Sequence, residues 1–202
     1  TNQYLKNIGL EAKKASHLMA KVSTQQKNDA LTFLIELLNS KAATILKANE
    51  KDVQAAKKNK LDRASIDRLI ISSKTIDSMI KGIQDIIDLR DPIGEIVHLN
   101  SRPSGIQVGQ MRVALGVIGM IYESRPNVTI DAASLSIKSG NAIILRGGSE
   151  SIHSNIALSG LIHEALKKSG LSIKAVQVID STDRSIVKGM IKLNDYIDVI
   201  IP

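Results

Sequence analysis

The chain has 202 residues, of which 43% are hydrophobic and 23% are charged, and its formal net charge is +7. This balance is typical of a globular protein and excludes disordered, collagen-like and coiled-coil chains. The absence of cysteine excludes a disulfide framework, a thiolate zinc site and a cysteine nucleophile within these residues. Only four aromatic residues are present, which disfavours nucleic-acid modules that stack bases on aromatic rings.

The excess positive charge lies in residues 1–60, which contain eleven lysines, no arginine and five acidic residues. Such a segment is either a surface for nucleic acid or membrane, or the solvent-facing side of lysine-rich helices. The missing arginine favours the helices, so we expect no nucleic-acid partner. The chain has no run of about 18 apolar residues and no signal-peptide pattern, so we also expect no membrane contact and a cytoplasmic location.

Residues 1–92 are predicted to be almost entirely helical. Apolar residues at spacings of three and four form one stripe along residues 3–22. Ser23 and Gln26 then form a capping-box pattern that opens a second helix, which continues through Leu38. Further helices are expected over about 40–59, 61–71 and 76–87, and Asp91-Pro92 stops the last of them.

The pattern changes at residue 93. Residues 93–111 contain β-branched residues and a group of turn residues around Pro103, which predicts a β-hairpin, followed by a buried strand at 112–121. Apolar strands and helices then alternate: strands at 113–122, 142–146, 175–179 and 196–201, and helices at 129–138, 151–168 and 183–193.

This order predicts an α/β fold with a helical N-terminal region, a β-hairpin and a Rossmann-like parallel sheet with helices on both faces. We divide the chain accordingly into residues 1–92, 93–111 and 112–202. The chain stops at Pro202, directly after an apolar strand that would ordinarily lead into a loop and a helix. We therefore expect it to be the first half of a longer polypeptide.

Ligands of parallel sheets lie beyond the carboxyl ends of the strands. One candidate loop there is Arg146-Gly147-Gly148-Ser149-Glu150. Its glycines allow close backbone approach, the next helix offers free N–H groups that suit phosphate, and Arg146 can bind phosphate or ribose oxygens. The alternative is an ordinary turn with a helix cap, because the loop is neither a Gly-x-Gly-x-x-Gly fingerprint nor a phosphate-binding loop of the Gly-Lys-Ser/Thr type.

The second candidate loop, Tyr122 to Asn127, follows the preceding strand and would lie beside the first if the two strands are neighbours. The side-chain amide of Asn127 is a candidate donor to a developing oxyanion. The alternative is that Asn127 or Thr129 only caps the next helix. The four histidines have no metal-ligand spacing, so we expect no metal site.

The stretch GVIGMIYESRPNVTIDAASLSIKSGNAIILRGGSES resembles the γ-glutamyl phosphate reductase family, also called glutamate-5-semialdehyde dehydrogenases, of the aldehyde dehydrogenase superfamily. The resemblance extends through LDRASIDRLIIS, LRDPIGEI and the terminal YIDVIIP, so it covers essentially the whole chain. It implies an aldehyde dehydrogenase-like cofactor domain. It also implies NADPH-dependent reduction of L-glutamate 5-phosphate to L-glutamate 5-semialdehyde in proline biosynthesis, through a cysteine thioester.

The resemblance also implies roles for individual residues. Asn127 matches the oxyanion donor, and Arg146 matches a position that contacts the adenosine ribose. Ser149 falls where NAD-preferring relatives often carry a ribose-binding glutamate, so a serine beside Arg146 implies NADPH, although the adjacent Glu150 is the alternative occupant of that position. Ser124 and Arg125 are expected in the same crevice. The implied cofactor-binding set is Ser124, Arg125, Arg146, Gly147, Gly148, Ser149 and Glu150.

The nucleophilic cysteine of the family has no counterpart among these residues. We therefore expect the catalytic domain to be absent and the chain alone to be inactive. By the same resemblance, residues 93–111 are expected to join subunits of a homo-oligomer. The alternative function is a non-catalytic nucleotide-binding or interaction module with the same fold.

Overall fold

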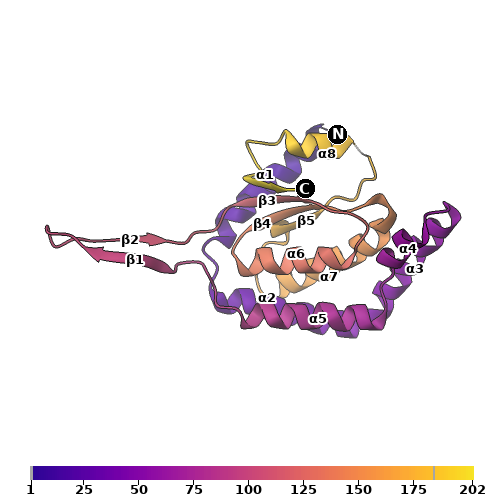
Figure 1. The fold of residues 1–202 in the computed structure, drawn as a ribbon, viewed down its shortest axis with the longest axis horizontal. Helices are drawn as coiled ribbons and strands as arrows, with labels where there is room; N and C mark the ends of the chain where they lie inside the picture. Colours follow the sequence, from indigo (N-terminus) through magenta and orange to yellow (C-terminus); the bar gives the residue numbers. More distant parts are fainter. Residues whose placement is uncertain (1, 184) are drawn as a thin grey trace.

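The computed structural model describes residues 2–183 and 185–202. Within these residues, a sheet of four parallel strands forms the centre of the molecule (Figure 1). The strands are β3 (Val117–Ile121), β4 (Ala142–Arg146), β5 (Val176–Val178) and β6 (Val199–Ile201), in the spatial order β5-β4-β3-β6. The order reverses at β3, because β4 and β5 lie on one side of it and β6 lies on the other.

Helices cover both faces of the sheet (Figure 1). Helices α6 (Asn127–Lys138) and α7 (Ile152–Lys168) lie on one face, and α1 (Asn2–Met19) and α8 (Ser185–Ile191) lie on the other. The outer sides of α6 and α7 are covered in turn by α2 (Thr24–Ser40) and α5 (Ser73–Asp88). The remaining helical elements are α3 (Ala42–Lys58), α4 (Arg63–Leu69) and the short 3-10 turns η1 (Ser149–Ser151) and η2 (Ile173–Ala175).

The core is one aliphatic cluster that joins the N-terminal helices to the sheet and its covering helices. Leu31 and Leu38 of α2 and Ile83 of α5 pack in the same cluster as Ile143 and Ile144 of β4. The predicted α/β fold class is confirmed, since helices, a hairpin and a parallel sheet follow in the expected order. None of the described helices is long and apolar enough to cross a membrane.

The starts of α2, α4 and α5 follow local capping chemistry. The Ser23 side chain accepts a hydrogen bond from the backbone N–H of Gln26 at the start of α2. Ser72 and Thr75 form a reciprocal capping box at the start of α5. The Asp62 carboxylate accepts a hydrogen bond from the N–H of Ser65 and so orients the short helix α4.

The predicted strand at 112–121 is too long, because β3 begins only at Val117. Val113 and Leu115 are 72% and 61% exposed, so the segment before β3 is not a buried strand. Gly116 ends that segment with a φ of +117°, and a Cβ at this position would collide with the Asp198 carboxylate. The same carboxylate accepts a hydrogen bond from the Val117 N–H at 2.8 Å. A backbone turn therefore sets the start of the strand.

Other predicted elements were also too long: α4 covers 63–69 instead of 61–71, and β5 covers 176–178 instead of 175–179. The first helix ends at Met19 instead of residue 22, and α8 covers 185–191 instead of 183–193. The strand predicted at 196–201 is confined to β6, because the N–H groups of Tyr196 and Ile197 both donate to the Leu193 carbonyl in a turn. Apolar character alone does not separate such turns from strands.

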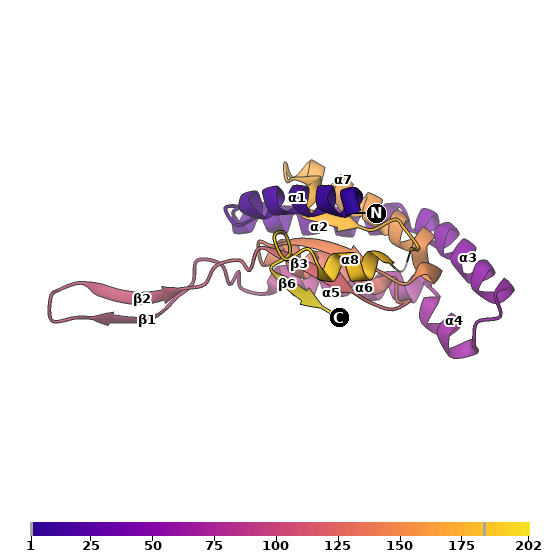
Figure 2. The same ribbon diagram turned by 90° about the horizontal axis from the view of Figure 1, so that it is seen from above.

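The predicted hairpin consists of β1 (Ile96–Ser101) and β2 (Gln107–Met111), paired antiparallel. It projects away from the rest of the molecule in both views (Figures 1 and 2). Its apolar side chains, including Ile96, Leu99 and Ile106, are exposed. The hairpin therefore adds no side chain to the core.

A buried ion pair lies at the base of this hairpin. The Lys27 ammonium of α2, 1% exposed, lies 2.9 Å from Asp91 Oδ2, and the other oxygen of Asp91 accepts a hydrogen bond from the Ile93 N–H. Lys138 of α6 donates to Asn28 Oδ1 and to the Ile87 carbonyl nearby. These contacts fix the point where the chain leaves α5 for the hairpin.

Candidate functional site

The two predicted loops lie side by side at the carboxyl edge of the sheet. Ile121 of β3 is the register partner of Arg146 of β4, and the Tyr122 N–H donates to the Arg146 carbonyl at 3.0 Å. Loop 122–127 and loop 146–150 therefore leave the sheet from the same edge, as neighbouring parallel strands require.

A cleft of about 390 Å³ opens between these loops and α4, and we call it the carboxyl-edge cleft. It receives side chains from three separate stretches of sequence. The lining residues are Ser65, Arg68, Tyr122, Glu123, Ser124, Arg146, Gly148 and Glu150. Ser124, Arg146, Gly148 and Glu150 were predicted from the sequence, whereas Ser65 and Arg68 were not.

Close packing accounts for both glycines of loop 146–150. A Cβ at Gly147 would collide with the Asn155 amide and lie 3.0 Å from the Tyr122 ring. A Cβ at Gly148 would lie 2.6 Å from Ser124 Oγ and 2.7 Å from Glu150 Oε2. The glycines thus let the backbone pack directly against the neighbouring loop.

A chain of hydrogen bonds supports the loops from below. The Tyr122 hydroxyl lies 2.6 Å from Thr129 Oγ1, and Thr129 Oγ1 donates to Asn155 Oδ1. Asn155 Nδ2 in turn donates to Ser151 Oγ, which donates to the Gly148 carbonyl. Because Thr129 uses its only hydrogen on Asn155, the Tyr122 hydroxyl is the donor to Thr129. Burial raises the pKa of Tyr122 to about 12, so the phenol remains neutral and keeps this role.

The Arg146 guanidinium is only partly satisfied. Its Nη1 donates to the Gly147 carbonyl at 2.9 Å, but its Nε is buried and has no partner among the described residues. A buried N–H without an acceptor is costly and rare.

Glu150 places a carboxylate in the same cleft. It accepts hydrogen bonds from Ser124 Oγ at 2.8 Å and from Ser149 Oγ at 3.2 Å. Burial alone would raise the pKa of Glu150, but hydrogen bonds from its own N–H and these two hydroxyls, with the Arg146 charge, lower it. Glu150 lines both the carboxyl-edge cleft and a separate hollow of about 210 Å³ beside α3, whereas Ser149 lines only the hollow. The structure thus places in the cleft the glutamate that the sequence left as the alternative to Ser149.

Two of the N–H groups at the start of α7, where the sequence predicted free N–H groups, are already occupied. The carboxylate of Asp52, a buried residue of α3, accepts hydrogen bonds from the N–H groups of His153 and Ser154 at 3.1 and 2.8 Å, and from Ser154 Oγ at 2.6 Å. This carboxylate satisfies the helix N-terminus and opposes its positive potential. Phosphate recognition in the cleft must therefore come from other groups.

Asn127 is the first residue of α6 and does not cap it. Pro126 occupies the capping position without a side-chain bond, and Thr129 is engaged with Tyr122 and Asn155. The Asn127 amide instead donates to Asp131 Oδ2 at 3.3 Å. Burial raises the pKa of Asp131, and the bond from Asn127 partly offsets this effect. Neither Asn127 nor the exposed Arg125 is among the residues that line the carboxyl-edge cleft.

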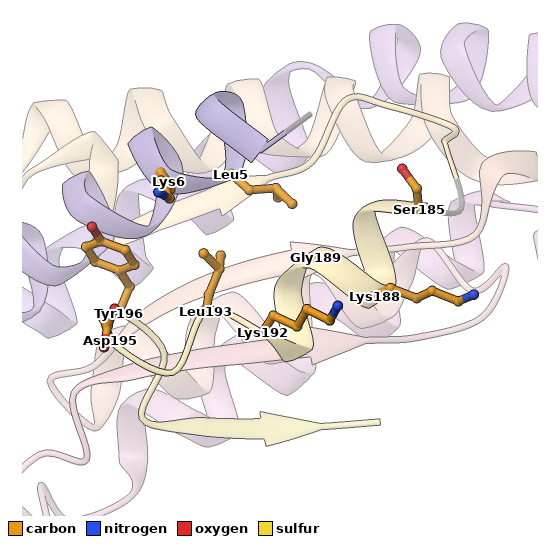
Figure 3. A pocket seen from close by; sticks show the side chains of 9 residues that line it. All are labelled: Leu5, Lys6, Ser185, Lys188, Gly189, Lys192, Leu193, Asp195 and Tyr196. Carbon is orange, nitrogen blue, oxygen red and sulfur yellow. The ribbon is translucent and has the colours of Figure 1, made fainter.

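A larger cavity of about 480 Å³ lies away from both loops, between α1 and α8 (Figure 3). Lys6, Lys188 and Lys192 line it together with Asp195 and apolar side chains. It contains none of the residues predicted to bind a ligand. Among residues 2–183 and 185–202, no group of three or more His, Asp or Glu side chains is arranged to hold a metal ion.

The fold is that of solved aldehyde dehydrogenases. Solved aldehyde dehydrogenases from Listeria monocytogenes and Bacillus subtilis share the fold at 18% and 20% identity, with TM-scores of 0.75 and 0.76. A glyceraldehyde-3-phosphate dehydrogenase from Methanocaldococcus jannaschii, solved in complex with NADP, matches 99% of the chain at 18% identity and a TM-score of 0.69, over 41% of its own length. No protein-family model matches the chain.

The particular resemblance is to γ-glutamyl phosphate reductases. The enzyme from Thermotoga maritima is 39% identical over 98% of this chain and 48% of its own, with a TM-score of 0.96. The enzyme from Saccharomyces cerevisiae is 29% identical over 97% of this chain and 50% of its own, with a TM-score of 0.89. The resemblance predicted from the sequence is confirmed, and the chain spans about half the length of these two reductases.

Proposed function

We propose that the chain is the cofactor-binding half of an NADPH-dependent γ-glutamyl phosphate reductase. The whole protein would reduce L-glutamate 5-phosphate to L-glutamate 5-semialdehyde and release phosphate, a step of proline biosynthesis. One observation carries this proposal: 39% identity and a TM-score of 0.96 to a γ-glutamyl phosphate reductase over 98% of the chain. The complex of a fold relative with NADP supports the choice of a nicotinamide cofactor.

The carboxyl-edge cleft has the donors and acceptors that the adenosine end of such a cofactor needs. Arg146 and Arg68 supply positive charge, and the unpartnered Nε of Arg146 lacks an acceptor. The Glu150 carboxylate is suited to accept a hydrogen bond from a ribose hydroxyl. We extend the proposed cofactor contacts to the rest of the predicted set, which comprises Ser124, Arg125, Gly147, Gly148 and Ser149.

When bound, the cofactor supplies the hydride. The contribution of this chain is to bind and orient, because acyl transfer through a thioester needs a cysteine that these 202 residues lack. Asn127 would donate its side-chain N–H to the oxygen that gains negative charge, and Asp131 orients the amide through the bond at 3.3 Å. Asn127 follows β3, the strand at which the sheet order reverses and where ligands of such sheets bind.

The exposed hairpin β1–β2 is a second part of the proposal. Its apolar side chains, such as Ile106 and Met111, are 60% exposed and would be covered in contacts between subunits of a homo-oligomer. We also propose that the protein acts in the cytoplasm on small-molecule substrates.

The test is an assay of the purified full-length protein that contains this chain, run in the direction of semialdehyde oxidation. NADP should be reduced only when L-glutamate 5-semialdehyde and inorganic phosphate are both present. Omission of phosphate is the matched control, because the acyl phosphate cannot form without it. A full-length protein that shows no such turnover, yet binds nucleotide, would instead be the non-catalytic module.

A further inference from the structure

Helix α4 brings a second guanidinium to the carboxyl-edge cleft from a distant part of the sequence. The Asp62 cap fixes the start of α4, and Arg68 lies in its last turn with its Nε donating to the Ala64 carbonyl at 3.2 Å. From there Arg68 lines the same cleft as Arg146. No local sequence pattern connects these two arginines, which are far apart along the chain.

The two guanidinium groups of the cleft have fewer or weaker partners than the carboxylate of Glu150. Arg68 Nη1 lies 3.4 Å from Glu123 Oε2, and the two side chains are 43% and 83% exposed, so this ion pair contributes little. Within the described part of the chain the Arg146 guanidinium donates from Nη1 to the Gly147 carbonyl, while its buried Nε has no partner. The Glu150 carboxylate, in contrast, already accepts two hydroxyl hydrogen bonds. Because Glu123 and Glu150 also place carboxylates in the cleft, only its two guanidinium groups favour an added anion.

The guanidinium groups of Arg68 and Arg146 are the donors that an anion would meet at the carboxyl edge of the sheet. The N-terminus of α7 follows loop 146–150. The Asp52 carboxylate already accepts hydrogen bonds from two N–H groups of this helix, those of His153 and Ser154. A phosphate placed at that helix end would meet a buried carboxylate of the same charge. Guanidinium groups are therefore the groups that would recognise a phosphate at this edge, because each can donate two parallel hydrogen bonds to a pair of phosphate oxygens.

We propose that Arg68 and Arg146 together bind the 2′-phosphate of NADPH and that Arg68 determines the preference for NADPH over NADH. This inference rests on the proposed function and extends it to a residue that the two loops do not contain. Arg68 exchanges its weak, exposed contact with Glu123 for a dianion. Glu150 remains available to a ribose hydroxyl, and Ser65 and Ser124 form the polar wall of the cleft.

The test measures binding to the full-length protein by isothermal titration calorimetry, with two probes that differ in one phosphate. Adenosine 2′,5′-bisphosphate carries the 2′-phosphate, and adenosine 5′-monophosphate lacks it. Arg68→Ala should weaken binding of the bisphosphate by about 10- to 100-fold, the usual loss for a charge-assisted hydrogen bond. Binding of the monophosphate should change by less than about twofold. Arg63→Ala, an exposed arginine of the same helix outside the cleft, should alter neither affinity.

The outcomes separate this inference from the proposed function. If the unmodified protein binds the bisphosphate and Arg68→Ala binds it equally well, Arg68 does not read the 2′-phosphate and only the inference fails. An equal loss for both probes also overturns it, because Arg68 would then contact another part of the nucleotide. If the unmodified protein binds neither probe nor NADPH, the proposed function itself fails.

Discussion

Arg146 is the residue at which the strand, the glycine loop and the cleft meet. Its guanidinium is proposed to bind the cofactor and not the reacting atoms, so Arg146→Ala should raise KM for NADPH more than it lowers kcat. Steady-state kinetics of the full-length enzyme at saturating second substrate would measure both constants. Arg63→Ala is the matched comparison, because Arg63 is exposed, does not line the carboxyl-edge cleft and lies outside the proposed cofactor-binding set. A change confined to KM for glutamyl phosphate would place the cofactor elsewhere.

Asn127 has the opposite proposed role at the residue scale. If its amide donates to the developing oxyanion, Asn127→Ala should lower kcat by about a hundredfold or more, with little change in KM for NADPH. Asn127→Asp is a useful companion, because it keeps the size of the side chain and replaces its donor with an acceptor. Full-length enzyme that turns over at the unmodified rate after either change would limit Asn127 to its contact with Asp131.

At the scale of elements, buried polar side chains of one helix organise the ends of others. Asn49 and Asp52 are both buried on α3. Asn49 donates to the carbonyl of Leu69, the last residue of α4, and accepts from the Ile71 N–H. Asp52 accepts from two N–H groups in the first turn of α7. Helix α3 thereby fixes α4, which contributes Arg68, relative to α7, which follows the glycine loop.

The pair of Lys27 and Asp91 fixes another junction, between α2, α5 and the base of the hairpin. Lys27→Met should lower the free energy of unfolding by about 3–5 kcal/mol, because it leaves the Asp91 carboxylate with its hydroxyl and N–H partners but without its countercharge. Lys41→Met is the matched control, because it breaks an ion pair that is exposed to solvent. The side chains of Lys41 and its partner Glu164 are 42% and 39% exposed. We expect that control to cost less than about 1 kcal/mol.

Chemical denaturation of the full-length protein, followed by circular dichroism, would measure both variants. Equal losses for Lys27→Met and Lys41→Met would contradict the prediction, because burial of the ion pair would then not matter.

At the scale of the whole molecule, the carboxyl groups predict an acid-sensitive fold. Within the described residues the pKa values of six carboxyls are lowered, in most cases because hydrogen bonds and nearby cations outweigh burial: Asp62, Asp91, Glu150, Glu164, Asp183 and Asp198. Each stabilises the fold above its unfolded pKa of about 4, and this contribution is lost as the pH falls through the folded pKa.

Asp131 acts in the opposite sense, because burial raises its pKa and its contribution disappears as the pH rises through that value. With six groups against one, the unfolding temperature should fall when the pH is lowered below about 4. Thermal scans of the full-length protein at a series of pH values would test this, and Asp91→Asn should flatten the dependence. An unfolding temperature that is constant from neutral to strongly acidic pH would refute it.

The sequence by itself determined the order of the elements and the position of the two loops. These follow from local signals: apolar periodicity, capping residues, and glycines after an apolar strand. Strand β4 was predicted with the bounds that the structure has, because Gly140 and Gly147 bracket a short apolar run. Boundaries failed where an apolar run continued into a turn, as at Val113–Gly116 and Tyr196–Ile197.

Only the tertiary structure decided what surrounds the two loops. Arg68 and Ser65 line the cleft because α4 packs against α3. Asp52 accepts hydrogen bonds at the start of α7 because α3 and α7 are in contact. The structure also places Glu150 between the cleft and the neighbouring hollow, both of which it lines, and Ser149 in the hollow alone. Such contacts join residues far apart in the chain, and periodicity and capping report only on neighbours within a few residues. The net charge of +7 likewise says little about the cleft, which is lined by two guanidinium groups and two carboxylates. The hydrogen-bond partners of each group, which only the structure gives, decide which groups are available to a ligand.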